Sequence, residues 1–194
     1  MLKGDYLTII DPGNDYTGFM ELFKLGHKPT DIKKIVLTHG HRDHVMGAVE
    51  LLRAYPELNE GEGFEVIFHE SGPEGLKKLL EEFKCPVIEV KGGEMLNLGG
   101  SEWEVIFTPG HTMEITTYLL IDEKGKEHGI ITGDTLFIGD VGRPDLAQHV
   151  VSDLTEEQKQ HLCGLRLPGD YKEIWASLPR FSPSMAAQGV DDPV

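Results

Sequence analysis

Three histidines and an aspartate fall within six residues of this chain, at His39, His41, Asp43 and His44, directly after an apolar run that ends at Leu37. Residues two apart in an extended segment point the same way, so the side chains of His39 and His41 can meet at one point. Asp43 and His44 follow after a turn, where they can face a second point or support the first through hydrogen bonds. Imidazoles and carboxylates are common metal ligands, and the spacing predicts a site for one metal ion or two.

The cluster fits two alternative kinds of segment less well. A solvated, histidine-rich loop would need no metal, but so many imidazoles at the end of a strand are hard to explain in that way. The helical zinc motif has histidines four positions apart, whereas here the second and third histidines follow the first by two and five positions. The cluster therefore favours a metal site on a strand end and the loop after it.

The elements that must position these side chains follow from short apolar runs that alternate with Gly and Pro breaks and with segments of helical period. This alternation is typical of layered α/β folds. We expect helices at residues 16–25, 45–54 and 74–82, and strands at residues 6–10, 34–37, 64–68, 95–98, 103–107, 116–121 and 129–131.

Two of these expected strands end in loops that carry further candidate ligands. His111 follows the strand at 103–107, and Asp134 follows the strand at 129–131. Either residue alone would be weak evidence, because isolated motif matches often have structural causes. Together with the first cluster they give three strand ends with His or Asp, which predicts one site along one edge of a sheet.

Composition narrows the class of protein. The 194 residues are 39% hydrophobic, which suits one domain, and we place it at residues 1–175 with an irregular tail at 176–194. The net charge of −15 argues against a nucleic-acid partner. No apolar run approaches the ~18 residues of a membrane span, and no secretory signal pattern is visible. We therefore expect no membrane attachment. The two cysteines, Cys85 and Cys163, lie in no paired motif, which favours a reducing compartment and a cytoplasmic location.

The combined motif resembles that of the metallo-β-lactamase superfamily. Its H-x-H-x-D-H segment, later histidine and later aspartate correspond to positions in this chain, and Asp11-Pro12-Gly13 matches the family's early strand and turn. The resemblance extends to about Trp175 and implies an αββα sandwich with the site along one edge. The few residues before Tyr6 and the divergent end are compatible with the loss of an N-terminal edge strand and of the C-terminal end. The matching site positions are His39, His41, Asp43, His44, His111 and Asp134.

The stretch from Thr132 to Leu146 is similar to the persulfide dioxygenases of this superfamily, including those fused to rhodanese domains. The resemblance implies one Fe(II), with His39, His111 and Asp134 as ligands and catalytic residues. The substrates would be glutathione persulfide, or another thiol persulfide, and O2, and the product would be sulfite. Two histidines and one carboxylate also form the facial triad of non-haem iron oxygenases. A homodimer is compatible with the resemblance.

Two alternatives stay open. A glyoxalase II-like thioester hydrolase would bind Zn, commonly as two ions. It would use His41 with His39 and His111 at one ion, Asp43 with His44 at the other, and Asp134 between them. The family's C-terminal Pro-Ala-His segment is absent after Trp175, which weakens a second metal site and moves His41, Asp43 and His44 towards support of the ligands. The other alternative is a truncated, inactive member that binds metal.

Arg143 is the one candidate substrate-binding residue outside the metal motif. The resemblance implies that it helps to bind the glutathione moiety, and a guanidinium can form a paired contact with a substrate carboxylate. A structural ion pair with Asp140 or Asp145 explains the residue equally well.

Overall fold

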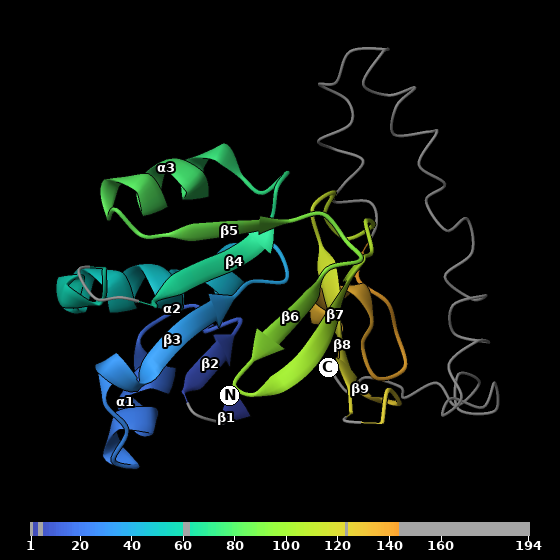
Figure 1. Cartoon of the computed structure of the whole chain (residues 1–194). Helices are drawn as coiled ribbons and strands as arrows, with labels where there is room; N and C mark the ends of the chain where they lie inside the picture. The colour runs from blue at the N-terminus through green and yellow to red at the C-terminus, as the bar shows by residue number, and fades with distance from the viewer. Residues whose placement is uncertain (1, 4–5, 60–62, 123, 144–194) are drawn as a thin grey trace, which may run out of the picture.

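The first half of the chain is a parallel sheet with helices in its connections (Figure 1). The structure is a computed structural model that describes residues 2–3, 6–59, 63–122 and 124–143. Strands and helices alternate as β2 (Leu7–Ile10), α1 (Thr17–Lys24), β3 (Ile32–Val36), α2 (Arg42–Ala54), β4 (Glu65–His69), α3 (Glu74–Glu82) and β5 (Val87–Val90). Strands β2 to β5 are parallel neighbours, and the two-residue β1 (Leu2–Lys3) pairs antiparallel with β2 at the edge.

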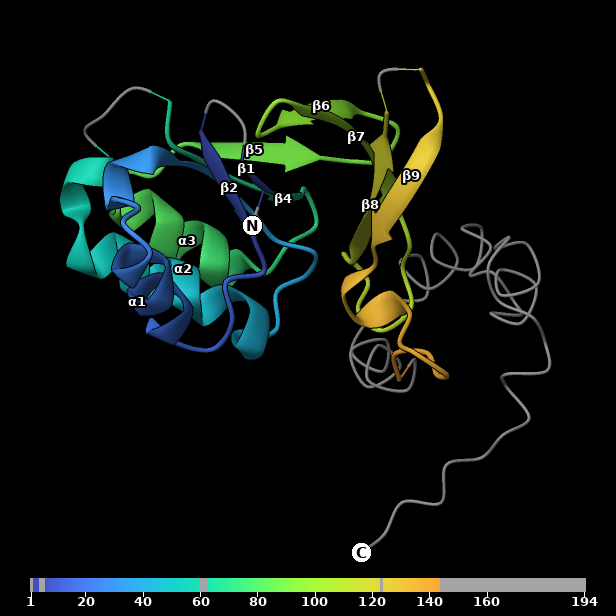
Figure 2. The ribbon, with the colours of Figure 1, turned by 90° about the horizontal axis from the view of Figure 1, so that it is seen from below.

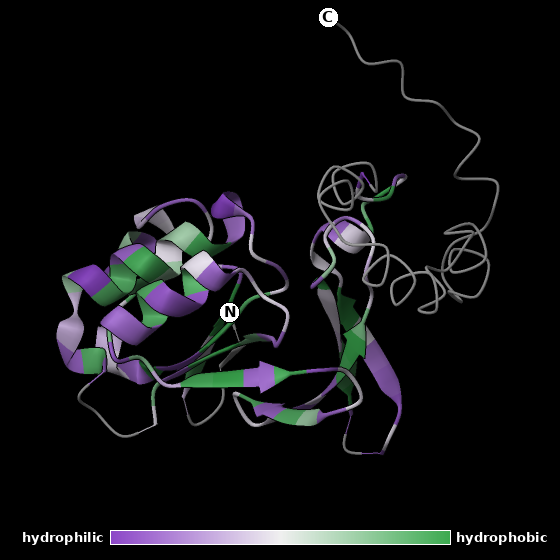
Figure 3. Cartoon of the chain, turned by 90° about the horizontal axis from the view of Figure 1, so that it is seen from above, coloured by the Kyte–Doolittle hydropathy of each residue, from purple (hydrophilic) through white to green (hydrophobic). Residues whose placement is uncertain are grey.

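The helices pack on one face of this sheet because each carries an apolar stripe. In Figure 3 hydrophobic and hydrophilic residues alternate around the helices, and Figure 2 shows all three helices on the same side of the sheet. A buried cluster joins the two layers, with Phe19 from α1, Leu51 from α2, Leu80 from α3 and Ile35 from β3 among its members. Burial of such side chains is the main favourable term in folding.

A second, antiparallel sheet covers the other face of the first one. Its strands lie in the order β6 (Met95–Leu98), β7 (Ser101–Phe107), β8 (Thr116–Ile121) and β9 (Glu127–Ile131). Val36, Ile67 and Val90 of the first sheet pack against Leu98, Trp103, Val105 and Tyr118 of the second in a separate buried cluster. The described residues thus form a helix layer and two sheet layers, and the second helical layer of the expected αββα sandwich is not among them.

Several element boundaries differ from those expected from sequence. Helix α2 begins at Arg42 rather than at residue 45, so Asp43 and His44 lie in its first turn. The apolar period begins only at Val45, so the polar first turn carries no periodic signal. Strand β5 is absent from the sequence-based prediction because Ile88 and Glu89 in its middle are exposed, which gives it no clear alternation. The sequence suggests that an N-terminal edge strand of the first sheet is lost. In the structure β1 occupies that edge and pairs with β2.

Other expectations fall partly outside the described residues. The boundary at residue 175 and the irregular tail at 176–194 cannot be compared with the structure, because its description ends at residue 143. Within the described ranges, no helix is both long and apolar enough to cross a membrane.

Candidate metal centre

All the candidate ligands lie where strands of the two sheets end. His39 and His41 follow β3, His111 follows β7, and Asp134 lies in a short 3-10 turn, Gly133–Thr135, directly after β9. Strands β7 and β9 run in the same direction because both are antiparallel to β8, so their loops emerge at one edge. The topology therefore brings these separate segments together, as the strand-end pattern predicts.

Hydrogen bonds between the sheets hold these loops in register. The backbone amide of Thr116 donates to the carbonyl oxygen of Thr38 at 2.9 Å, and the Tyr118 hydroxyl donates to the carbonyl oxygen of Leu37 at 3.1 Å. On the other side of the site, the Thr108 hydroxyl lies 3.1 Å from the Thr135 hydroxyl, which ties the His111 loop to the Asp134 turn. Thr38 and Thr116 are fully buried, so their bond forms away from water.

Three imidazoles and one carboxylate meet at a single point. The Nε2 atom of His39 lies 3.0 Å from Nδ1 of His41, and Nε2 of His111 lies 2.9 Å from the same nitrogen. The Oδ2 atom of Asp134 lies 3.3 Å from Nε2 of His111. One ligand atom from each of the four residues lies within 4.8 Å of the other three. His41 is therefore as central to the cluster as the three ligands expected from sequence.

This donor set fits a metal ion. In a tetrahedral zinc site with bonds of ~2.1 Å, the donor atoms are ~3.4 Å apart. The distances of 2.9 to 3.3 Å found here are slightly shorter, so small movements of the side chains would open the cluster to metal dimensions. Three imidazoles and a carboxylate are donors that suit Zn or Fe equally.

A second group of possible ligands lies beside the first, and Asp134 belongs to both. Its Oδ1 atom lies 3.3 Å from Nε2 of His44, while its Oδ2 atom faces His111. Asp43 lies next to His44, with its Oδ2 atom 3.8 Å from the same Nε2, and its side chain is 71% exposed. The two oxygens of Asp134 thus face different groups of donors, so this one carboxylate is within reach of both.

Asp11 supports His44 from behind, a role that sequence reasoning did not assign. Its Oδ2 atom accepts hydrogen bonds from Nδ1 of His44 at 2.9 Å and from the Thr38 hydroxyl at 2.7 Å, and its Oδ1 atom accepts from the Thr38 amide at 2.8 Å. The backbone φ of Asp11 is +44°, an unusual value for a residue with a side chain. The carboxylate places the proton of His44 on Nδ1 and leaves Nε2 free to bind a metal.

The environment keeps the two most buried imidazoles of the cluster uncharged. Burial, and then the three neighbouring imidazoles, lower the pKa of His39 to about 2. Burial also lowers the pKa of His111, against the opposing charge of Asp134. A neutral imidazole is the form that binds a metal.

His44 behaves in the opposite way. Burial alone would lower its pKa, but the hydrogen bond and the charge of Asp11, together with the charges of Asp134 and Asp43, raise the pKa above its usual value. The imidazole of His44 is therefore surrounded by three carboxylates, those of Asp11, Asp43 and Asp134. This negative surrounding favours a cation at the second group of donors.

Arg143 lies in the loop after Asp134, at the edge of the described residues. The preceding Gly142 is packed so closely that an added Cβ would collide with the carbonyl oxygen of Asp134 and lie 3.0 Å from Cβ of His111. The loop is therefore held against the cluster, while Arg143 itself is exposed. Asp145 lies outside the described residues. Substrate binding by Arg143 stays a prediction.

Comparisons with known proteins agree with this geometry. A family model described as the metallo-beta-lactamase superfamily matches residues 2–179. The chain is 32% identical over 138 residues to a hydroxyacylglutathione hydrolase from Yersinia enterocolitica, covering 71% of this chain and 45% of that protein. It is 30% identical to hydroxyacylglutathione hydrolase GloC from Haemophilus influenzae, covering 71% of this chain and 64% of that protein.

A solved structure also resembles the fold. The chain superposes with a TM-score of 0.52 on a metallo-beta-lactamase family protein from Thermus thermophilus, covering 74% of this chain and 56% of that one at 20% identity. At this identity the likeness supports the fold alone. The chain spans about half the length of the Yersinia relative that it matches.

Proposed function

The chain belongs to the metallo-β-lactamase superfamily, and from the arrangement of its site we propose that it is a metal-dependent hydrolase of thioesters, with an acylated glutathione as the substrate. The observation that carries this proposal is the position of Asp134 between two groups of donors. The names of the relatives from Yersinia enterocolitica and Haemophilus influenzae support the choice of reaction. They favour the hydrolase over the persulfide dioxygenase that the sequence alone leads us to expect.

In this proposal His39, His41 and His111 would hold one metal ion, Asp43 and His44 would hold a second, and Asp134 would contribute a carboxylate oxygen to each. Bound metal ions lower the pKa of a water molecule, so that it can attack a carbonyl carbon at neutral pH, and they polarise the carbonyl. Zn suits this chemistry and the imidazole-rich set. A two-histidine, one-carboxylate iron site is less well supported, because His41 lies within 3.0 Å of both other histidines.

The protein's own residues have separate tasks in this scheme. The buried, neutral His39 and His111 fix one side of the site, and Asp11 orients His44 on the other. The described part of the chain gives the second group only Asp43, His44 and the shared Asp134, and Asp43 is mostly exposed. We therefore expect the three-histidine group to bind metal more tightly than the second group.

The experiment compares the two reactions on one preparation. The chain is produced with zinc and iron both available, its metal content is measured, and the release of thiol from a hydroxyacyl-glutathione thioester is followed with and without O2. We expect zinc in the protein and equal thiol release in both atmospheres. Uptake of O2 on glutathione persulfide with no thioester cleavage would instead establish the dioxygenase. Bound metal with neither activity would establish the inactive, metal-binding member.

A matched pair of variants ties the activity to the site. His111→Gln removes one imidazole from the cluster, whereas His128→Gln removes an exposed imidazole on β9. We expect thiol release to be lost in the first variant and kept in the second. Equal activity in the two variants would show that the hydrolysis does not depend on this centre.

A further inference from the structure

A carboxylate from the loop between β7 and β8 holds the peptide between the first two histidines. The backbone amide of Gly40, which separates His39 from His41, donates a hydrogen bond of 3.1 Å to Oε1 of Glu114. Glu114 lies three positions after His111, in the connection that leads from β7 to β8. From this contact we propose that Glu114 is a positioning residue, which sets where His39 and His41 stand relative to His111 and so tunes the affinity of the three-histidine group for metal.

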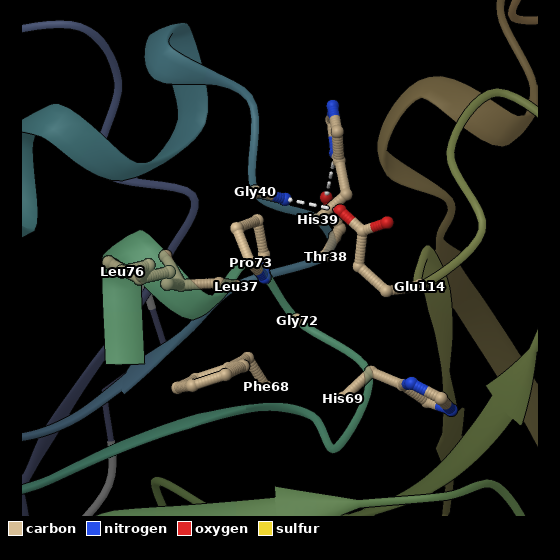
Figure 4. A pocket seen from close by; sticks show the side chains of 10 residues that line it. All are labelled: Leu37, Thr38, His39, Gly40, Phe68, His69, Gly72, Pro73, Leu76 and Glu114. Atoms are coloured by element: carbon tan, nitrogen blue, oxygen red, sulfur yellow. Dashed lines mark hydrogen bonds between the residues drawn. The ribbon is translucent and has the colours of Figure 1, made fainter. Parts of the chain in front are cut away.

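Gly40 is enclosed from two sides. An added Cβ would collide with the ring of Pro73 and would lie 3.3 Å from Oε1 of Glu114. Figure 4 shows this arrangement, with Gly40 between the Pro73 ring and the Glu114 carboxylate. The amide therefore has little room to turn to another partner. The hydrogen bond to Glu114 therefore restrains the orientation of this peptide.

Two other side chains or amides of the second sheet bond to this loop, but to residues that precede the first histidine. Thr116 and Tyr118 of β8 bind the carbonyl oxygens of Thr38 and Leu37, before the first histidine. Among the bonds of the described residues, the one from Gly40 to Glu114 joins the loop between β7 and β8 to the peptide between the two imidazoles. Both imidazoles must approach His111 from a different sheet, and this contact links the two loops directly. A displaced ligand loses affinity, because metal sites require defined geometry.

This proposal rests on the metal centre of the proposed function, and it is tested by metal binding in the absence of substrate. The zinc dissociation constant is measured by competition with a chelator for the wild-type chain, Glu114→Ala and Glu114→Gln. Loss of a residue that orients ligands typically weakens binding ~10- to 100-fold, and we expect a loss in this range for Glu114→Ala. Glu114→Gln keeps an oxygen for the Gly40 amide, so we expect it to stay within ~3-fold of wild type, allowing for a weaker neutral hydrogen bond.

A matched control separates positioning from general stability. Glu94 makes the same kind of contact elsewhere, since its carboxylate accepts hydrogen bonds from the amides of Lys91 and Gly92 at 2.8 Å. We expect Glu94→Ala to leave zinc affinity unchanged. The visible spectrum of the Co²⁺-substituted protein adds a second measurement, because its bands report ligand geometry: they should shift in Glu114→Ala and not in Glu94→Ala.

Three results would overturn the proposal. Glu114→Ala could bind zinc as tightly as wild type, which would make the contact irrelevant to the site. Glu114→Gln could lose as much affinity as Glu114→Ala, which would show that charge acts and not position. A wild-type chain that binds no zinc would remove both this proposal and the metal centre, whereas zinc binding without thioester cleavage would remove the proposed function alone.

Discussion

Replacement of Asp11 by asparagine tests the support of the second donor group most directly. The Asp11 carboxylate accepts three hydrogen bonds, two from Thr38 and one from Nδ1 of His44. Asparagine has nearly the same shape and tolerates the positive φ of +44° at this position. Asparagine keeps only one accepting oxygen, however, and its NH2 group takes the place of the other oxygen. That NH2 group then faces one of the donors that bonded to the carboxylate, either on Thr38 or on His44. If the amide faces His44, the histidine proton moves to Nε2, the atom that lies near Asp134.

The magnitude follows from these bonds. A hydrogen bond to a charged group contributes about 1.5–3 kcal/mol to stability. The loss of one such bond should therefore lower the free energy of unfolding by about 2 kcal/mol. In a chain of this size that lowers the Tm by roughly 4–8 °C. Loss of the histidine orientation should weaken binding of the second metal equivalent ~10- to 100-fold. The first equivalent should be weakened less than the second, because Asp11 bonds directly to none of its three histidines. Its link to that group runs only through the Thr38 hydroxyl, which lies 3.0 Å from Nδ1 of His39.

The assay is a zinc titration of the metal-free chain against a competing chelator, resolved into two equivalents, with a thermal melt of the same samples. Asp15→Asn is the matched control, since Asp15 is an exposed aspartate of the same loop whose carboxylate accepts a hydrogen bond from the Thr17 amide. We expect the control to bind both equivalents normally. The reasoning fails if Asp11→Asn binds the second equivalent as tightly as the control does, or if it loses the first equivalent instead.

Three further outcomes follow from the structure. His111→Ala should lose the tighter metal equivalent by more than ~100-fold while the far-ultraviolet circular dichroism stays unchanged, and full metal occupancy would contradict the assigned cluster. Gly133→Ala should destabilise the chain by about 1–2 kcal/mol in a urea melt, because Gly133 has a φ of +50° and a Cβ there would collide with the Thr38 hydroxyl; an unchanged midpoint would refute this. Burial raises the pKa of the Cys85 thiol to about 12 from 9.0, so in a Cys163→Ser chain this remaining thiol should resist alkylation at pH 8, and rapid labelling would contradict its burial. Because the folded state favours the neutral thiol, the free energy of unfolding should fall as the pH rises from 9 towards 12.

Local patterns are sufficient for most of the elements and for a first set of ligands. The strand that leads to His39, and the loops that carry His111 and Asp134, can be recognised because apolar runs and Gly or Pro breaks depend only on neighbours in the chain. The same local view misses β5, whose middle residues are exposed, and it begins α2 three residues late. A helix start without apolar residues, or an edge strand without alternation, leaves no periodic signal.

Tertiary structure alone decided which donors meet. His41 lies 2.9 Å from a ring that is 70 residues away in the chain, Asp11 bonds to His44 across 33 residues, and Glu114 bonds to Gly40 across 74. These contacts depend on how two sheets stack and which strand ends share an edge, and no short-range pattern encodes such distances. The types of donor and their positions at strand ends thus follow from the sequence itself. The sequence leaves two groupings of these donors open, one with His41 among the ligands and one without it. Only the packing of one sheet on the other brings His41 next to His39 and His111 and puts Asp134 between two groups, because a metal site is defined by converging atoms and not by spacing along the chain.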